Sequence, residues 1–257
     1  MLVHEVQGPA VVDADTEVSR LLVTRQDVSR MYRPLGFLDA RTTDESVDYE
    51  FSYLARAVRD PGFRPLLGFR EVRRYESRGL FPLFSERLMD PRRPDRADFL
   101  AALALDADAS PLLVLSRSGG RRVGDAIELT PVPLTDDQGR SQCIFLVHGV
   151  RHLMPAGGEV IDRLSEGDAL ALEPQPDNDH NERALLVTAE AGTPVGWVPD
   201  VLLDYVRGLS GASVHVVRAN GPQVGSRLRL LVRVAGAAAP GWEPFSGPDW
   251  ELAPSVA

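Results

Sequence analysis

Lysine is absent from this sequence, and all 28 of its basic residues are arginine. This absence excludes several kinds of site, because a phosphate-binding loop, a Schiff base and the catalytic strand of a protein kinase each need a lysine. Isoleucine and asparagine are also scarce. The codons of these three residues are rich in A and T, so a GC-rich genome accounts for the bias before any functional selection does.

Cysteine occurs once, at Cys143, which excludes an intrachain disulfide and a zinc site built from several cysteines. The thiol lies in an apolar run, where we expect a small inert side chain. The five histidines show no metal-binding spacing. A metal site would have to combine His152 and His180 with Asp177 or Asp179, and we expect no metal and no other cofactor.

Long apolar runs are missing as well. No stretch of about 18 apolar residues is present, so we expect no transmembrane helix and no membrane partner. The first residues lack a basic segment followed by an apolar one, so we also expect no signal peptide. A cytoplasmic protein is the default expectation. The 257 residues suit one large domain or two ordinary ones, at roughly 100–200 residues each.

Charge is unevenly distributed within the net charge of -9. Residues 1–140 contain 20 arginines and 23 acidic residues, a net of -3, and residues 141–257 contain 8 and 14, a net of -6. The segment 64–96 holds nine arginines and five acidic residues, a net of +4. It could face nucleic acid or an acidic partner. The interleaved acids favour a solvated, salt-bridged loop region instead.

The first half reads as a mixture of short strands and helices. Ser110 and Pro111 are typical of a helix start, and Gly119-Gly120 of a helix stop. Gly119-Gly120-Arg121-Arg122 could alternatively cradle a phosphate, which is the weaker interpretation. We expect Leu80–Phe84 to lie mainly in the core. The expected strands are 20–25, 31–38, 47–53 and 121–129, and the expected helices are 53–58, 95–105 and 111–118.

The second half has a different sequence pattern, in which short strand-like runs and turn residues dominate. Such a pattern is typical of a small barrel. Two short helices are expected near 158–164 and 199–209. The expected strands are 143–148, 169–172, 184–188, 195–198, 213–217 and 227–234.

The fold class we predict is therefore α+β, with a small α+β module followed by a small β-barrel that carries short helices. The polar segment 136–141 is the candidate boundary. In the tail we expect Trp242 and Trp250 to pin the chain to the protein surface. The predicted organisation is a flexible arm over 1–18, a first module over 19–135, a barrel over 141–235 and a tail over 236–257.

Four segments of the second half, in order, resemble the HIRAN domain, a small β-barrel module. They are Phe145-Leu-Val-His-Gly-Val-Arg-His, Leu164-Ser-Glu-Gly-Asp-Ala-Leu-Ala-Leu-Glu-Pro, Asp177-Asn-Asp-His-Asn-Glu-Arg-Ala-Leu-Leu-Val and Val195-Gly-Trp-Val-Pro. The resemblance covers about 143–234. In eukaryotic fork-remodelling proteins this domain holds the 3′ end of single-stranded DNA.

The resemblance implies a set of nucleic-acid-binding residues. An arginine-aromatic pair on the first strand corresponds to Arg151 and His152, and a loop corresponds to Asn178, His180 and Asn181. The next lining position is Trp197. The chain departs from the family pattern at Leu153, Asp179, Asn181 and Arg183.

Ordinary structural roles are open for the same residues. Arg151 could pair with Asp162 or Glu166 at a strand end. Asn178 could hold a turn through contacts with its own backbone. His180 could be a loop residue without a ligand, and Trp197 could be part of the apolar core.

The first half resembles the small N-terminal lobe of HipA-like toxin kinases of bacteria, over about 19–133. The matching segments include Tyr32-Arg-Pro-Leu-Gly-Phe-Leu, Phe51-Ser-Tyr-Leu and Gly79-Leu-Phe-Pro-Leu-Phe-Ser-Glu-Arg-Leu. The kinase core that follows this lobe in those enzymes is absent. In some split toxin-antitoxin systems the lobe is a separate protein that restrains the kinase.

The function we expect is that of a non-enzymatic nucleic-acid-binding protein, in which the barrel holds a single-stranded DNA end or a similar anionic ligand. Arginine beside a stackable ring is a common way to hold unpaired bases and phosphates. The alternative is a protein-interaction module, such as an antitoxin-like regulator of a HipA-type kinase.

Overall fold

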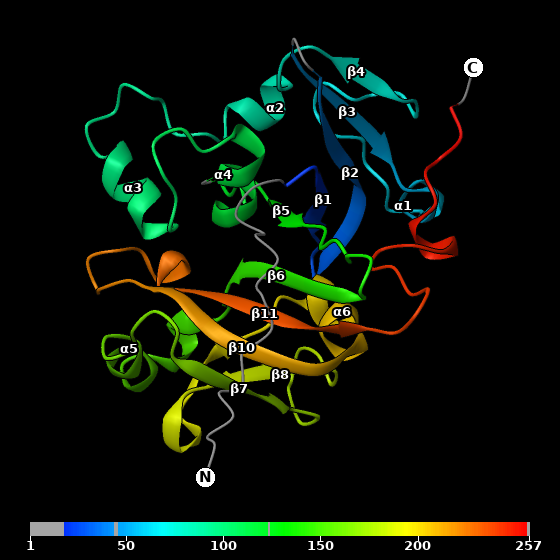
Figure 1. The fold of residues 1–257 in the computed structure, drawn as a ribbon. Helices are drawn as coiled ribbons and strands as arrows, with labels where there is room; N and C mark the ends of the chain where they lie inside the picture. The colour runs from blue at the N-terminus through cyan, green and yellow to red at the C-terminus, as the bar shows by residue number, and fades with distance from the viewer. Residues whose placement is uncertain (1–17, 44–45, 123, 256–257) are drawn as a thin grey trace.

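The computed structural model describes residues 18–43, 46–122 and 124–255. The predicted arm over 1–18 lies outside these residues except for Val18. The chain forms two antiparallel sheets, one above the other in Figure 1, with short helices around both. No helix among the described residues combines the length and the apolar character needed to cross a membrane.

The N-terminal sheet has the strand order β4-β3-β2-β1-β5. Its strands are β1 (Arg20–Gln26), β2 (Tyr32–Thr42), β3 (Val47–Tyr53), β4 (Tyr75–Ser77) and β5 (Ile127–Pro131). The helices beside it are α1 (Ala55–Arg59), α2 (Pro82–Ser85), α3 (Arg96–Ala102) and α4 (Pro111–Ser118).

Local signals account for α4 and β3, whose bounds agree with the prediction. The Ser110 hydroxyl accepts a hydrogen bond from the Leu113 N–H at 3.3 Å, and Gly119 ends the helix in the left-handed conformation, with φ of 69°. Among the expected bounds that were wrong are those of α3 and β5. Helix α3 ends at Ala102 rather than at residue 105, and β5 begins at Ile127 rather than at residue 121.

The second sheet, called the barrel below, has the order β6-β11-β10-β7-β8-β9. Its strands are β6 (Arg140–Leu146), β7 (Ala169–Pro174), β8 (Leu185–Thr188), β9 (Pro194–Trp197), β10 (Leu209–Ala219) and β11 (Leu230–Ala238). The helices of the second half are η1 (Val150–Leu153), α5 (Ala156–Ile161), η2 (Glu190–Gly192), η3 (Asp200–Leu202), α6 (Leu203–Gly208), η4 (Ser226–Leu228) and η5 (Pro248–Trp250).

The barrel sheet curls so that its two edges meet. The chain just after β6 forms an antiparallel bridge with β9, at His148 and Trp197. A sheet that curls onto itself covers its edge strands and encloses its own core. The predicted α+β class with a curled sheet in the second half is confirmed.

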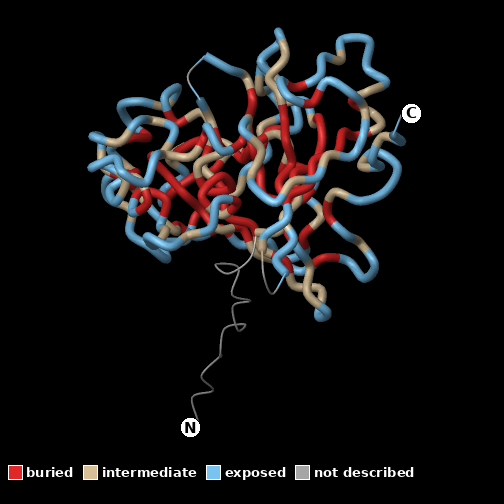
Figure 2. Tube along the Cα trace, turned by 90° about the horizontal axis from the view of Figure 1, so that it is seen from above, coloured by how far each residue is buried: buried red, intermediate tan, exposed pale blue. Residues whose placement is uncertain are grey.

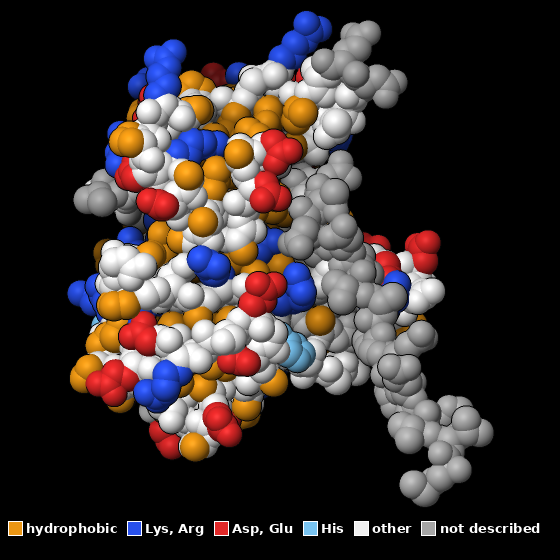
Figure 3. Space-filling view, turned by 60° about the vertical axis from the view of Figure 1, so that its left-hand side comes forward, with side chains coloured by type: hydrophobic (Ala, Val, Ile, Leu, Met, Phe, Trp, Pro, Cys, Tyr) orange, Lys and Arg blue, Asp and Glu red, His pale blue; other side chains and the backbone are white. Residues whose placement is uncertain are grey.

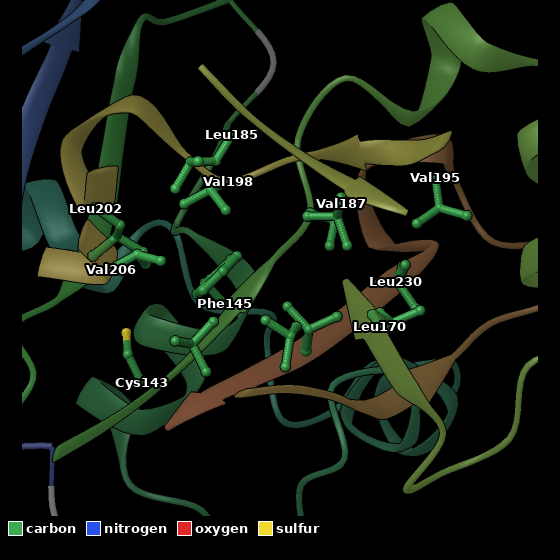
Figure 4. Packing of buried hydrophobic residues seen from close by; sticks show 14 of the residues in the cluster. Cys143, Phe145, Leu170, Leu185, Val187, Val195, Val198, Leu202, Val206 and Leu230 are labelled. Atoms are coloured by element: carbon green, nitrogen blue, oxygen red, sulfur yellow. The ribbon is translucent and has the colours of Figure 1, made fainter. Parts of the chain in front are cut away.

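Each sheet has its own apolar core. Figure 4 shows the barrel core, in which Phe145, Val187 and Leu230 approach one another from three strands. Phe84 is fully buried in the other core, as expected for the Leu80–Phe84 segment. Figure 2 shows the buried segments running through the interior, with exposed residues in the outer loops. Burial raises the pKa of the Cys143 thiol to about 12, so this cysteine is protonated and inert as predicted.

The tail returns from the barrel to the N-terminal sheet (Figure 1). Strand β11 continues to Ala238, inside the segment predicted as tail. Trp242 stacks on Tyr205 of the barrel, with ring centroids 6.4 Å apart. Trp250 lies 6.0 Å from the Phe37 ring, and the Arg56 guanidinium lies 3.9 Å from the Trp250 centroid. Both tryptophans therefore hold the tail against the protein, and the tail joins the two halves.

Candidate functional site

The closure of the barrel places Trp197 at the junction of two edges. The backbone N–H of Trp197 donates to the His148 carbonyl, and the His148 N–H donates to the Trp197 carbonyl, both at 2.9 Å. The preceding Gly196 has a φ of 147°, and a Cβ there would collide with Val147 and the His148 carbonyl. Only glycine allows the two edges to come this close.

The Trp197 indole connects two surface segments. Its Nε1 donates a hydrogen bond of 2.6 Å to Oε1 of Gln175. Its six-membered ring lies against Gly149, where a Cβ would be 2.7 Å from Cζ3. Gly149 has a φ of 72° and directly precedes η1. The half-buried ring of Trp197 thus lies between the loop that begins at Gln175 and the turn η1.

Asn178 holds the loop of residues 175–183 in shape. Its Oδ1 accepts the N–H groups of His180 at 3.0 Å and Asn181 at 3.1 Å. Its Nδ2 donates to the same Gln175 Oε1 that accepts from Trp197, at 2.9 Å. This is the turn-holding arrangement open to asparagine, and the Gln175 amide links it to Trp197. A direct contact of Asn178 with a ligand stays a prediction.

The remaining loop residues divide into one that is anchored and one that is exposed. Asn181 Nδ2 donates to Asp200 Oδ1 at 2.7 Å, which ties the loop to η3. Arg183 pairs with Asp204. The His180 side chain is exposed and makes no hydrogen bond or ring contact within the described part of the chain. His180 is therefore available to a ligand, whereas Asn181 is engaged in the fold.

Arg151 and His152 lie in the 3-10 turn η1, which follows β6, and not on the first strand as the family pattern implies. Both are exposed, and Arg151 Nε donates to His152 Nε2 at 3.1 Å. The alternative in which Arg151 pairs with Asp162 is not realised, because Asp162 binds Arg229 at 2.8 Å. No ion pair joins Arg151 to Glu166 among the described residues. The terminal nitrogens of Arg151 are thus available to an anion.

The structure joins these segments in one chain of contacts. Through Gln175, Trp197 reaches the loop of Asn178, and through Gly149 it adjoins the turn of Arg151. The arrangement offers an indole, an imidazole and a guanidinium on neighbouring segments. Such groups can stack on unpaired bases and bind phosphate.

A buried ion pair connects this site to the N-terminal sheet. The carboxylate of Glu128, in β5, is 2.9 Å from His148 Nε2 and 2.5 Å from Arg121 Nη2. Burial raises the pKa of Glu128, but His148 and Arg121 outweigh burial and hold that pKa below its ordinary value. Because the His148 backbone pairs with Trp197, Glu128 fixes the residue on which the barrel closes.

The other sequence candidates have structural roles. Arg121 and Arg122 follow the helix stop and pair with Glu128 and Glu86, so the phosphate-cradle alternative has no support in the geometry. In the segment 64–96, four arginines pair with carboxylates, namely Arg73, Arg74, Arg87 and Arg93. Within the described residues, no group of three or more His, Cys, Asp or Glu side chains could hold a metal ion.

Sequence reasoning missed Gln175 and Gly149, which link the predicted residues. Gln175 is 22 positions from Trp197, and Gly149 is 48 positions away. No local pattern marks either one, because each acts only after the barrel has closed. The pairing of the His148 backbone with Trp197 was not predicted either, because it too depends on contacts between residues far apart in the sequence.

No family model matches the chain, and no curated protein matches it. The comparison with solved structures returns the crystal structure of the HIRAN domain of human HLTF, with 16% sequence identity and a TM-score of 0.28. The match covers 42% of this chain and 80% of that chain. The HipA-like resemblance of residues 19–133 stays a prediction.

Proposed function

We propose that this protein binds single-stranded nucleic acid, at an end or at a similar exposed stretch, and does so without catalysis. The site consists of Trp197, the turn η1 and the loop 175–183. One observation carries the proposal: the Trp197 ring lies against Gly149, at the start of the turn that exposes Arg151 and His152. Aromatic rings beside an uncompensated arginine suit unpaired bases and their phosphates.

The contacts of each side chain indicate which residues would bind the nucleic acid and which hold the loop. The Arg151 guanidinium donates through Nε to His152, which leaves its terminal nitrogens for one phosphate. The exposed rings of His152 and His180 offer stacking surfaces. Asn178, Asn181 and Gln175 hold the loop in place. The role of an arginine clamp beside a ring is sequence-tolerant, because every base has a π face and every nucleotide a phosphate.

Fluorescence anisotropy tests the proposal directly. Oligonucleotides labelled at the 5′ end, with either a 3′-hydroxyl or a 3′-phosphate, are titrated with the protein over a salt series. We expect binding that weakens with salt, and a loss of about tenfold with Arg151→Gln, since a charge-assisted contact is removed. The matched control is Arg59→Gln, an exposed arginine of α1, which should bind as the wild type does.

Two results would overturn the proposal: no binding at about 50 mM salt, where electrostatic attraction is strong, or equal binding by the Arg151→Gln protein. The absence of catalysis has its own measurement. Labelled oligonucleotide incubated with the protein and Mg²⁺ should return intact on a denaturing gel, and cleavage that increases with protein concentration would contradict the non-enzymatic part.

A further inference from the structure

The barrel holds arginines that the fold does not use. Residues 141–257 contain eight arginines. Five of them engage other groups of the protein, namely Arg183, Arg207, Arg218, Arg229 and Arg233. Arg151 binds only its neighbour His152. The side chains of Arg163 and Arg227 make no hydrogen bond or ion pair within the described residues, and both are exposed.

These two arginines flank one ion pair, whose arginine is buried and whose aspartate is partly exposed. Arg229, whose side chain is 2% exposed, donates to Asp162 Oδ1 at 2.8 Å and to the Gly158 carbonyl at 3.0 Å. Arg163 follows Asp162 in sequence, and Arg227 precedes Arg229 by two residues. The Asp162–Arg229 pair therefore holds the chain around Arg163 and the chain around Arg227 together.

Both segments also contact the turn of the proposed site. Helix α5, which ends two residues before Arg163, packs against η1, and so does η4, which contains Arg227. The η4 loop is fixed on its other side by Asn220, whose Nδ2 donates to the Ala102 carbonyl of α3 at 2.8 Å. Figure 3 brings forward the side on which Figure 1 shows α3 and α5, and basic side chains are exposed there among acidic ones.

We propose that Arg163 and Arg227 form a second phosphate-binding region, which extends the site at Arg151 along a single strand of several nucleotides. This inference rests on the proposed function. Three guanidinium groups without carboxylate partners, on segments that contact one turn, suit successive phosphates of an extended strand.

Oligonucleotide length separates the two regions. A dinucleotide carries one bridging phosphate and can engage one region at a time, whereas a 12-nucleotide strand carries enough phosphates for both. We expect the double variant Arg163→Gln/Arg227→Gln to weaken 12-nucleotide binding about tenfold and to change dinucleotide binding less than twofold. The slope of log affinity against log salt should fall by about 0.7 for each phosphate that the variant no longer neutralises.

The controls keep the outcomes distinct. The Arg163→Lys/Arg227→Lys protein retains the charges and should bind the 12-nucleotide strand within about threefold of wild type, since lysine also binds phosphate as a point charge. This inference is overturned if the glutamine double variant binds the 12-nucleotide strand as tightly as the wild type does while Arg151→Gln binds it more weakly. That outcome leaves the proposed function standing. Absence of binding by the wild type to either strand overturns both.

Discussion

The arginine-rich segment 64–96 and the arginines of the barrel show how little net charge says about a binding surface. The segment has a net of +4, and carboxylates compensate four of its nine arginines. Arg64 and Arg96 donate to backbone carbonyls, and three further arginines have no side-chain partner in the described chain. The barrel half has a net of -6, yet Arg151, Arg163 and Arg227 have no carboxylate partner in the described chain. Local pairing, rather than the sum of charges, decides where an anion can bind.

Buried and exposed arginines also differ in what they contribute to stability. Arg229 and Arg87 are buried and bind both carboxylates and backbone carbonyls, so they hold segments together. Arg73 forms an exposed pair with Glu71. Exposed pairs contribute little to stability, and removal of one partner from a buried pair costs much more.

The largest effect is expected for Arg229→Met. This change removes the donor to Asp162 and to the Asn220 carbonyl, and one of the two donors to the Gly158 carbonyl, which keeps the Asp162 N–H. We expect the free energy of unfolding to fall by about 3 kcal/mol. Urea unfolding followed by far-UV circular dichroism measures it. Arg73→Met is the matched control and should cost less than about 1 kcal/mol. Equal losses for the two variants would remove the distinction between buried and exposed arginines.

Glu128→Gln tests the link between the halves. The variant keeps the shape but loses the charge that faces Arg121 and His148, so we expect a loss of about 2 kcal/mol at pH 7. Because folding lowers the pKa of Glu128, its contribution is present above the ordinary value of 4.5 and is lost as pH falls through the lower folded pKa. Unfolding free energies measured from pH 7 to pH 3 should therefore converge for variant and wild type. A constant difference across this range would show that the Glu128 charge is not the cause.

Asn178→Ala should have a smaller effect, about 1 kcal/mol, because it removes the acceptor that holds the His180 and Asn181 N–H groups. Asn178→Asp keeps that acceptor and should lose less stability than alanine does. Thermal unfolding of the two variants makes the comparison. If both bind oligonucleotides as the wild type does, Asn178 acts only on the loop; a larger loss of affinity than of stability would place it in contact with the ligand.

The smallest effect is expected for the arginines of the segment 64–96 that have no protein partner in the described chain. They are Arg70, Arg78 and Arg92, and they lie in loops of the N-terminal half. The triple change to glutamine should alter the affinity for a 12-nucleotide strand less than twofold. The three charges that it removes attract the strand only over a distance, and salt screens that attraction. A loss as large as that of Arg163→Gln/Arg227→Gln would move the nucleic-acid interface to the first half.

Much of the secondary structure was predictable from local patterns. Alternation gave β3, and capping residues gave α4, since these signals act within a few residues. The strand start at Ile127 was missed because Arg121 and Arg122 pair with Glu128 and Glu86, and no local rule expresses those pairs. Arg151 lies beyond the predicted end of the strand at residue 148, where Gly149 turns the chain into η1.

By itself, the sequence determined which side chains are available: arginine without lysine, one inert thiol, and a few polar and aromatic candidates for a binding site. It also determined the α+β succession of secondary structure. Tertiary structure alone decided which of them meet. The barrel closes at His148 and Trp197, and that closure brings Gln175 and Gly149 to the same indole. It also decided which arginines remain free, because ion pairs such as Asp162–Arg229 join residues 67 positions apart. Compensation of charge depends on distance in space, which residue order does not contain.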